Sequence, residues 1–257
     1  AISAVGTVSF PNMTRTGGNA TANGAGIFAA DDALTITNCV IANNVTTTRG
    51  GGISFIAGGS VTVINSTISG NSAQGGGGIY CFSTGTLIID NCTISGNTAS
   101  QSLGGGGVLN MSSTVTIRNS TISGNHATGG TGGGITLQNV AASVTIQNST
   151  IAFNDATATG GGIQRTAGSL SLESTIVAEN TAVTDGDDVF GTVNFAKFNL
   201  VGATDGSTGI TDSSNKTGTK ASPLDPLLGA LTNNGGPTPT HALFAGGPAI
   251  NTGNNST

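Results

Sequence analysis

The chain has 257 residues, of which only 7% are charged, 4% are aromatic and 43 are glycine, and its formal net charge is −5. An average soluble domain carries about 25% charged residues, so this surface must be built mainly from Ser, Thr, Asn and Gly. The seven cations form no basic run. Phosphate binding requires clustered Lys and Arg, so nucleic acid is not expected as a partner. No segment approaches the roughly 20 consecutive apolar residues of a membrane span.

A ten-residue pattern, T-I-x-N-S-T-I-S-G-N, occurs six times in this sequence. Its copies are Thr35–Asn44, Thr62–Asn71, Ile88–Asn97, Thr116–Asn125, Thr145–Asn154 and, in a more divergent form, Ser171–Asn180. The nearly constant spacing between the copies indicates that one structural unit is stacked on itself. Most of the similarity between copies therefore serves the stacking of these units.

Each copy has the features of short strands separated by sharp bends. Apolar and polar residues alternate, as in Leu34-Thr35-Ile36, which is typical of a strand with one buried face. The first asparagine of the pattern, Asn38 in the first copy, is a residue that tolerates the left-handed backbone conformation of a bend. A glycine run that ends in an aliphatic residue, such as Gly50–Ile53, leads a further strand.

Three strands and three bends in about 26 residues predict an all-β fold, a right-handed single-stranded parallel β-helix of about seven three-strand coils. We assign residues 1–184 to the parallel β-helix repeats and residues 185–257 to a C-terminal capping segment. The period stops near residue 184, and Asp185–Thr257 contains all but one of the prolines. A solenoid needs such a cap because its last coil exposes strand edges and an apolar cross-section.

The asparagine that ends the pattern recurs at intervals of 25 to 29 residues once Asn19 is included. Asn19 is included because it stands eight residues before Ile27, as Asn71 stands before Ile79. Stacked amides at the spacing of neighbouring strands can donate and accept hydrogen bonds along the stacking axis. The sequence therefore predicts a structural ladder of Asn19, Asn44, Asn71, Asn97, Asn125, Asn154 and Asn180.

The N-terminal end shows no comparable capping sequence, and residues 1–30 offer only Pro11 and Arg15 to block strand pairing. Exposed strand edges at a solenoid end are templates for further pairing. We therefore expect the protein itself as a partner, through head-to-tail assembly at the N-terminal coil. The alternative is that Ala1–Phe10 folds across the first coil and leaves a monomer.

The three cysteines do not form a disulfide framework. Cys39 and Cys92 occupy the same column of the repeat, two coils apart. Their separation is then roughly 10 Å, which is beyond the reach of a disulfide. Cys81 lies in a different column. Buried free thiols that pack as small apolar residues are expected.

The few charged side chains do not form a catalytic constellation in the sequence. Asp90 and Arg118 occupy the same column of adjacent coils and predict a surface ion pair, and no second carboxylate shares a coil with Asp90. His126 is expected in a protruding loop and His241 in the cap. Neither histidine has a second His or Cys at metal-ligand spacing, and no Gly-x-Ser-x-Gly motif accompanies the many serines.

One acidic cluster near the end of the repeats is a weak candidate for a metal site. It consists of Asp185, Asp187 and Asp188. Carboxylate oxygens are the ligands that calcium prefers, but these are too few and do not match the twelve-residue calcium loop. An acidic turn is the preferred interpretation, and no cofactor is expected.

The sequence resembles known families at two levels. The coils resemble the right-handed β-helix repeats of bacterial surface and secreted proteins, including the polymorphic outer-membrane type. Asp225–Leu231, Asn233–Leu243 and Gly247–Gly253, with Phe198–Gly202, look like the signature of choice-of-anchor Q domain proteins. This resemblance implies export and display on a bacterial surface, and the family offers no established catalytic residues.

We therefore expect a non-catalytic secreted or cell-surface β-solenoid with a structural or adhesive role, such as a self-assembling fibre subunit. Two alternatives use the same fold, namely a polysaccharide lyase or glycoside hydrolase, and a module that binds surface glycans. Two or more carboxylates within about 10 Å of each other in a groove would favour hydrolysis. A surface of bare Ser, Thr and Asn would favour a structural role.

Overall fold

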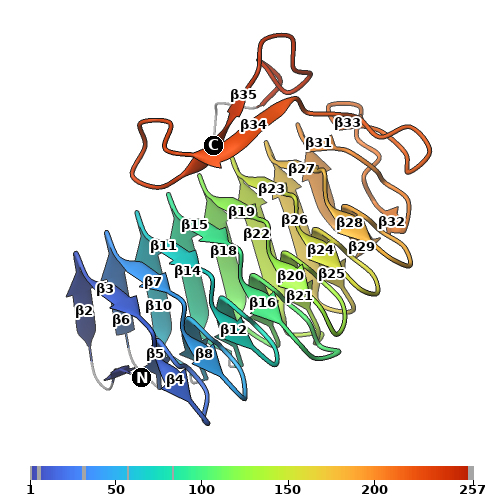
Figure 1. Cartoon of the computed structure of the whole chain (residues 1–257). Coiled ribbons are helices and arrows are strands. Elements are labelled where there is room, and N and C mark those ends of the chain that lie inside the picture. Colours follow the sequence, from blue (N-terminus) through green and yellow to red (C-terminus); the bar gives the residue numbers. More distant parts are fainter. Residues whose placement is uncertain (1, 5–6, 31–32, 57, 83, 254–257) are drawn as a thin grey trace.

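The computed structural model describes residues 2–4, 7–30, 33–56, 58–82 and 84–253, and the only regular secondary structure in these ranges is β-strand. Four parallel sheets form the walls of a solenoid (Figure 1). Each turn of the chain adds one strand to each wall, so a strand pairs with the strand four places later in the chain. The predicted parallel β-helix is confirmed.

The four walls are numbered here in the order in which the chain enters them. Sheet 1 contains β1 (Ile2–Ala4), β5 (Ile27–Ala29), β9 (Ile53–Phe55), β13 (Ile79–Cys81), β17 (Val108–Asn110), β21 (Ile135–Leu137), β25 (Ile163–Arg165), β29 (Val189–Thr192) and β32 (Ser207–Thr208). Sheet 2 contains β2 (Val8–Pro11), β6 (Ala33–Thr37), β10 (Ser60–Ile64), β14 (Thr86–Asp90), β18 (Thr114–Arg118), β22 (Ser143–Gln147), β26 (Ser169–Glu173) and β30 (Phe195–Lys197).

The other two walls differ in the length of their strands. Sheet 3 contains β3 (Thr14–Thr16), β7 (Val40–Ala42), β11 (Thr67–Ser69), β15 (Thr93–Ser95), β19 (Thr121–Ser123), β23 (Thr150–Ala152), β27 (Ile176–Ala178), β31 (Leu200–Val201) and β33 (Lys216–Thr217). Sheet 4 contains β4 (Asn19–Ala20), β8 (Val45–Thr46), β12 (Ser72–Ala73), β16 (Thr98–Ala99), β20 (His126–Ala127), β24 (Asp155–Ala156) and β28 (Thr181–Ala182). A separate antiparallel hairpin consists of β34 (Leu228–Thr232) and β35 (Thr240–Leu243).

A complete coil has four strands and not the three that the sequence suggested. The additional strand is the one in sheet 4, which has only two residues and therefore shows no alternation in the sequence. In the described ranges, seven complete coils run from β1–β4 to β25–β28 and are followed by β29–β33. The solenoid walls thus continue to Thr217, past the boundary expected at residue 184. Strand pairing depends on backbone hydrogen bonds and not on the side-chain pattern of the repeat. The sheets therefore continue beyond the last copy of the repeat.

The core is a set of columns in which equivalent residues of successive coils lie on top of one another. In sheet 2, Ile36 pairs in register with Val63, and Val63 pairs with Ile89. All three side chains are completely buried. A register shift of one residue would turn every such side chain toward solvent, so burial fixes the register.

The predicted left-handed asparagine at the first bend is confirmed in the five coils for which it was expected. The φ angles of Asn38, Asn65 and Asn91 are 53°, 48° and 52°. Asn119 and Asn148 follow at 50° and 49°. Asparagine reaches this region at little steric cost because its short side chain can hydrogen-bond locally.

The predicted ladder lies inside the second bend and is fully hydrogen-bonded. Asn71 Oδ1 accepts hydrogen bonds from N and Nδ2 of Asn44 at 3.0 and 2.9 Å. Asn71 Nδ2 donates in turn to Asn97 Oδ1 at 2.9 Å and to Ile41 O at 3.0 Å. The same Asn-to-Asn bonding continues through Asn125, Asn154 and Asn180. The ladder residues are buried, so their polar groups rely on one another.

Asn19 is not part of this ladder. Its expected position is taken by Gly18, whose N donates to Asn44 Oδ1 at 2.9 Å. Asn19 is exposed and begins β4, where it pairs with Val45. The eight-residue spacing to Ile27 was misleading, because the second coil has nine residues between the equivalent positions.

A second column of hydrogen bonds runs beside the first bend, where cysteine and serine alternate. Cys39 N donates to Ser66 Oγ at 3.0 Å, Ser66 N to Cys92 Sγ at 3.5 Å, and Cys92 N to Ser120 Oγ at 3.1 Å. These cysteines and Cys81 are buried and free, as expected. Burial raises the pKa of the Cys92 thiol to about 12, so the sulfur remains a neutral member of the column.

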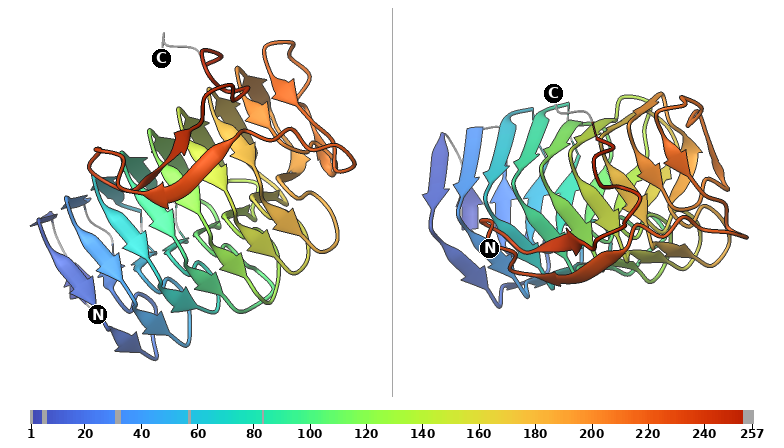
Figure 2. Two further views of the ribbon diagram at one scale, coloured as in Figure 1. Left: turned by 45° about the horizontal axis from the view of Figure 1, so that its top comes forward. Right: turned by 90° about the horizontal axis from the view of Figure 1, so that it is seen from above.

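The residues after β32 cover the flank of the solenoid as well as its end. Ile210 packs against the core cluster near the last coil, as expected of a cap. The hairpin β34–β35 instead lies lengthwise over the edge of several coils (Figures 1 and 2). Thr93 Oγ1 donates to Pro239 O at 2.5 Å, and Thr238 Oγ1 donates to Asn91 O at 3.2 Å. The hairpin is therefore docked on sheet 3 near the first-bend asparagines.

Replacing Asn97 or Asn125 with Leu should destabilise the protein. Each change leaves N–H groups of the neighbouring coil buried without an acceptor, which costs about 1–3 kcal/mol. We expect a lower unfolding free energy in denaturant titrations of both variants. Arg118→Ala is the control and should change little, because exposed ion pairs contribute little. Unchanged unfolding midpoints for both asparagine variants would contradict a stabilising role of the ladder.

Candidate functional site

The docked hairpin creates a groove along the outside of the solenoid. Its floor is the column of second-bend residues that precede the ladder asparagines, Gly96, Gly124, Phe153 and Glu179. Its wall is the hairpin with the segment before it. Phe153 lines two hollows, of about 500 and about 270 Å³, so the two lie side by side along this flank. We call this feature the hairpin groove.

The larger hollow of the hairpin groove is mostly apolar but contains a polar pair. Ser123 Oγ lies 2.8 Å from His241 Nε2, and His241 Nδ1 lies 2.7 Å from Gly229 O. A carbonyl only accepts, so Nδ1 carries the proton and Nε2 accepts a hydrogen bond from the serine. Burial lowers the pKa of His241, which favours this neutral form. Leu231 and Phe153 supply apolar lining beside the pair.

The smaller hollow contains two aromatic rings and two carboxylates. Phe153 and Phe244 are 41% and 57% exposed, so both rings are accessible to a ligand. Glu179 and Asp225 line the same hollow. Burial raises the pKa of Glu179, and the nearby charge of Asp225 raises it further. The two groups are therefore close enough to repel each other.

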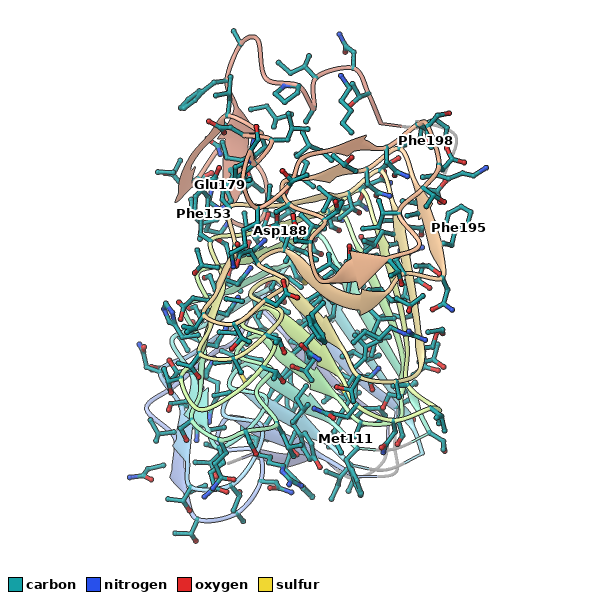
Figure 3. All side chains as sticks on the ribbon, turned by 90° about the vertical axis from the view of Figure 1, so that its right-hand side faces the viewer. Met111, Phe153, Glu179, Asp188, Phe195 and Phe198 are labelled. Atoms are coloured by element: carbon teal, nitrogen blue, oxygen red, sulfur yellow. The ribbon has the colours of Figure 1, made fainter. Side chains whose placement is uncertain are left out.

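Two floor residues of the hairpin groove break the rule of the repeat. The second bend has a left-handed backbone, and after Asn43 in one coil it is occupied by glycine in the next three, at Gly70, Gly96 and Gly124. The next two coils have Phe153 at φ 58° and Glu179 at φ 60°. A side chain in this conformation costs of order 1–3 kcal/mol, and such outliers gather at functional sites. Figure 3 shows both side chains on the side of the solenoid that carries the hairpin.

The three aspartates that were weak calcium candidates are engaged by different protein groups. Asp188 Oδ1 accepts from Asn180 Nδ2 at 2.9 Å and terminates the asparagine ladder. Asp187 Oδ1 accepts from Lys220 Nζ at 3.0 Å. Asp185 accepts a hydrogen bond from the backbone of its own turn. Within the described ranges, no three His, Cys, Asp or Glu side chains come together in a group that could hold a metal ion.

The other charged residues singled out in the sequence lie outside the hairpin groove. The expected ion pair is present, with Arg118 donating to Asp90 over 3.2 Å on the surface of sheet 2. His126 does not lie in a protruding loop but in β20, where its ring contacts the carboxylate of Asp155 in the next coil. Its strand was hidden in the sequence by its length of two residues.

Sequence reasoning did not identify Phe153, Glu179 or Asp225 as site residues. A signal for the first two was present, because Ser69-Gly70-Asn71 of an ordinary coil becomes Ala152-Phe153-Asn154 and Ala178-Glu179-Asn180. A loss of glycine at a position that needs a left-handed backbone is informative. No such signal exists for Asp225, whose place depends on the path of the hairpin.

Comparison with known proteins identifies the family of the chain. A family model described as the right-handed beta helix region matches residues 6–215, so the chain belongs to that family. No curated protein and no solved structure gives a significant match. In the described residues, no helix is long and apolar enough to cross a membrane.

Titration of Asp188 should make stability depend on pH. Burial raises the pKa of this carboxyl from 3.8 to about 7, although hydrogen bonds from Asn180 and Ala203 oppose the shift. Because the folded-state pKa is the higher one, the stabilisation is complete below the unfolded-state value and is lost as the pH rises through about 7. We expect the unfolding free energy to decrease, through this group, from about pH 4 to about pH 7.

Asp188→Asn tests this assignment. The amide keeps an oxygen for Asn180 but places an NH₂ group against the N–H of Ala203, which now donates to Asp188 Oδ2 at 2.6 Å. The variant should be less stable than the wild type at pH 5 and should lose this part of the pH dependence. Parallel stability–pH curves for the two proteins would show that Asp188 does not titrate in this range.

Proposed function

We propose that this protein is a secreted β-solenoid, displayed on a bacterial cell surface, with a structural and adhesive role in which the hairpin groove binds carbohydrate. The hairpin groove itself carries this proposal. It places exposed aromatic rings, carboxylates and a Ser123–His241 hydrogen bond along one flank of a rod whose coils are tied together by the asparagine ladder. Ligand sites are typically concave and largely apolar, with a few fixed polar groups.

Surface display is supported by composition and by the C-terminal segment. Only 7% of residues are charged, and the outward faces of the coils are built from Thr, Ser and Asn. The hairpin belongs to the segment that resembles the choice-of-anchor Q signature, and we propose the same surface location for this chain. The groove wall is thus made from the part of the sequence on which that resemblance rests.

Binding without turnover is favoured over polysaccharide cleavage. Asp90 is held by Arg118 and by Asn119, whose Nδ2 donates to it over 3.0 Å. Asp155 is held by His126. The carboxylates on the coil surfaces are thereby already used in contacts between coils. The Glu179–Asp225 pair is the arrangement that could support hydrolysis, and for this reason the test below includes it.

The full chain should bind oligosaccharides, as measured by calorimetry, and should release no reducing ends or unsaturated uronates from pectin, alginate or chitin, with or without calcium. Phe153→Gly restores the residue of the ordinary repeat at a left-handed position and should weaken binding at least tenfold. Phe195→Ala is a matched control, because this ring is 42% exposed in β30 of sheet 2, away from the groove.

Two results would contradict this function. Binding that is equal in the wild type and in Phe153→Gly would place the glycan site elsewhere or show that there is none. Product release that is abolished by Glu179→Gln, Asp90→Asn or Asp155→Asn would establish an enzyme.

Head-to-tail assembly through the N-terminal coil is opposed by Arg15. This residue occupies the inward column of sheet 3 and pairs in register with the core residue Ile41. Its guanidinium donates to carbonyl oxygens of Thr16, Ala25 and Gly26 at 3.1, 3.4 and 3.4 Å. An inward-pointing charge is a known protection of sheet edges. We therefore propose that the 257-residue chain is monomeric.

Arg15→Ile should convert this end of the solenoid into an apolar stacking surface. We expect the variant to form end-to-end assemblies in electron micrographs and in sedimentation experiments, whereas the wild type stays monomeric. Arg165→Ile is the control, because that side chain bonds to Gly168 O of its own loop. Filaments of the wild-type protein, or monomers of Arg15→Ile at high concentration, would contradict the role of Arg15.

A further inference from the structure

We propose that the hairpin groove selects a cationic amino-sugar chain, whose ammonium group binds between Glu179 and Asp225 beside the rings of Phe153 and Phe244. The inference rests on the proposed carbohydrate binding at the hairpin groove and specifies its ligand. It depends on four observations, which concern charge, aromatic rings, the length of the groove and its backbone.

The negative charge of the smaller hollow has no cationic partner among the described residues. The carboxylate of Glu179 makes no hydrogen bond or ion pair with the described residues, and that of Asp225 accepts one hydrogen bond, from Leu227 N at 2.7 Å. None of the ion pairs among the described residues includes either carboxylate. Burial and, to a smaller extent, repulsion by Asp225 hold the pKa of Glu179 above its usual range, and a positively charged ligand would relieve that repulsion. The hollow is therefore complementary to a cation.

The rings define the kind of cation. Phe153 and Phe244 both line the hollow that contains the carboxylates. Aromatic faces attract organic ammonium groups and also pack against apolar surface. An ammonium group attached to a pyranose ring satisfies both, because the ring offers an apolar face next to its charge. A metal ion would leave both rings without a partner.

The length of the groove indicates a chain and not a single sugar. The floor residues Gly96, Gly124, Phe153 and Glu179 belong to four successive coils. Neighbouring strands lie about 4.8 Å apart, so the floor extends over roughly 14 Å. The end away from the carboxylates presents the hydroxyl of Ser95 and the Ser123–His241 pair, which can hydrogen-bond to sugar hydroxyls.

The backbone of the floor disfavours a peptide as the occupant. The N–H groups of Gly96, Gly124 and Phe153 already donate to carbonyl oxygens of the neighbouring coil at 3.2, 3.2 and 3.1 Å. A peptide that binds as an added strand needs such groups to be free. A sugar chain is recognised by its hydroxyls, its ring faces and, in this case, its amine.

The experiment measures the affinity of the full chain for β-1,4-linked glucosamine tetramer, for the N-acetylated tetramer of the same linkage, and for tetralysine, by calorimetry at low and high salt. We expect the glucosamine tetramer to bind at least tenfold more tightly than the other two. This preference should shrink at high salt, because the charged contacts are partly exposed to solvent.

Variants separate the charged contacts from the rest of the groove. Glu179→Gln and Asp225→Asn should each weaken binding of the glucosamine tetramer five- to tenfold and leave the N-acetylated tetramer unaffected. Glu173→Gln is the control, because this carboxylate lies in β26 of sheet 2 and accepts from Gln147 Nε2 at 3.1 Å. Circular dichroism of each variant establishes that it is folded.

The outcomes distinguish the inference from the function on which it rests. Equal affinity for the two tetramers, tighter binding of tetralysine, or release of shorter sugars from the glucosamine tetramer would overturn the amino-sugar inference. A groove that binds neither sugar would overturn the proposed carbohydrate binding as well. Loss of selectivity in Glu179→Gln and Asp225→Asn, with retained binding of the N-acetylated tetramer, is the result that supports both.

Discussion

The structure depends on the hydrogen bonds that one buried amide makes to the next along the axis of the solenoid. At each second bend the chain turns sharply inward, and its backbone N–H would be left unsatisfied without the asparagine of the following coil. Asn71 Oδ1, for example, accepts hydrogen bonds from both the backbone N and the side-chain Nδ2 of Asn44. Because a buried unpaired donor is costly, the amides hold adjacent coils in register while the stacked isoleucines fill the space between the sheets.

Much of the fold could be predicted from the sequence because the same pattern of strand and bend residues occurs in successive coils. Asn38 and its equivalents indicated the first bend, and the alternation of Leu34, Thr35 and Ile36 indicated a strand. The short strands of sheet 4 could not be predicted, since a two-residue strand has no period. Asn19 was wrongly placed for a related reason: the number of residues between the ladder and the next strand of sheet 1 differs from coil to coil, and only backbone pairing settles which residue faces inward.

The hairpin groove was much less predictable than the walls. Its floor could have been suspected from the replacement of glycine by Phe153 and Glu179, but its wall comes from a segment that is distant in sequence and obeys no period. Asp225 and His241 meet the coils only because Thr93 and the first-bend asparagine Asn91 anchor the hairpin on sheet 3. Departures from a repeat thus indicate candidate site positions on the coils. The residues that face those positions depend on tertiary packing, which the repeat does not encode.

The last member of the asparagine ladder, Asp188, sets a limit on the length of the ladder. An asparagine in that place would receive hydrogen bonds from the coil below and offer its own NH₂ to a coil above, so the series could continue indefinitely. The carboxylate accepts hydrogen bonds on both oxygens, from Asn180 and from Ala203, and has no NH₂ group that could donate to a further coil. An aspartate in place of an asparagine therefore ends this hydrogen-bond series, while sheets 1 to 3 continue past it by backbone pairing.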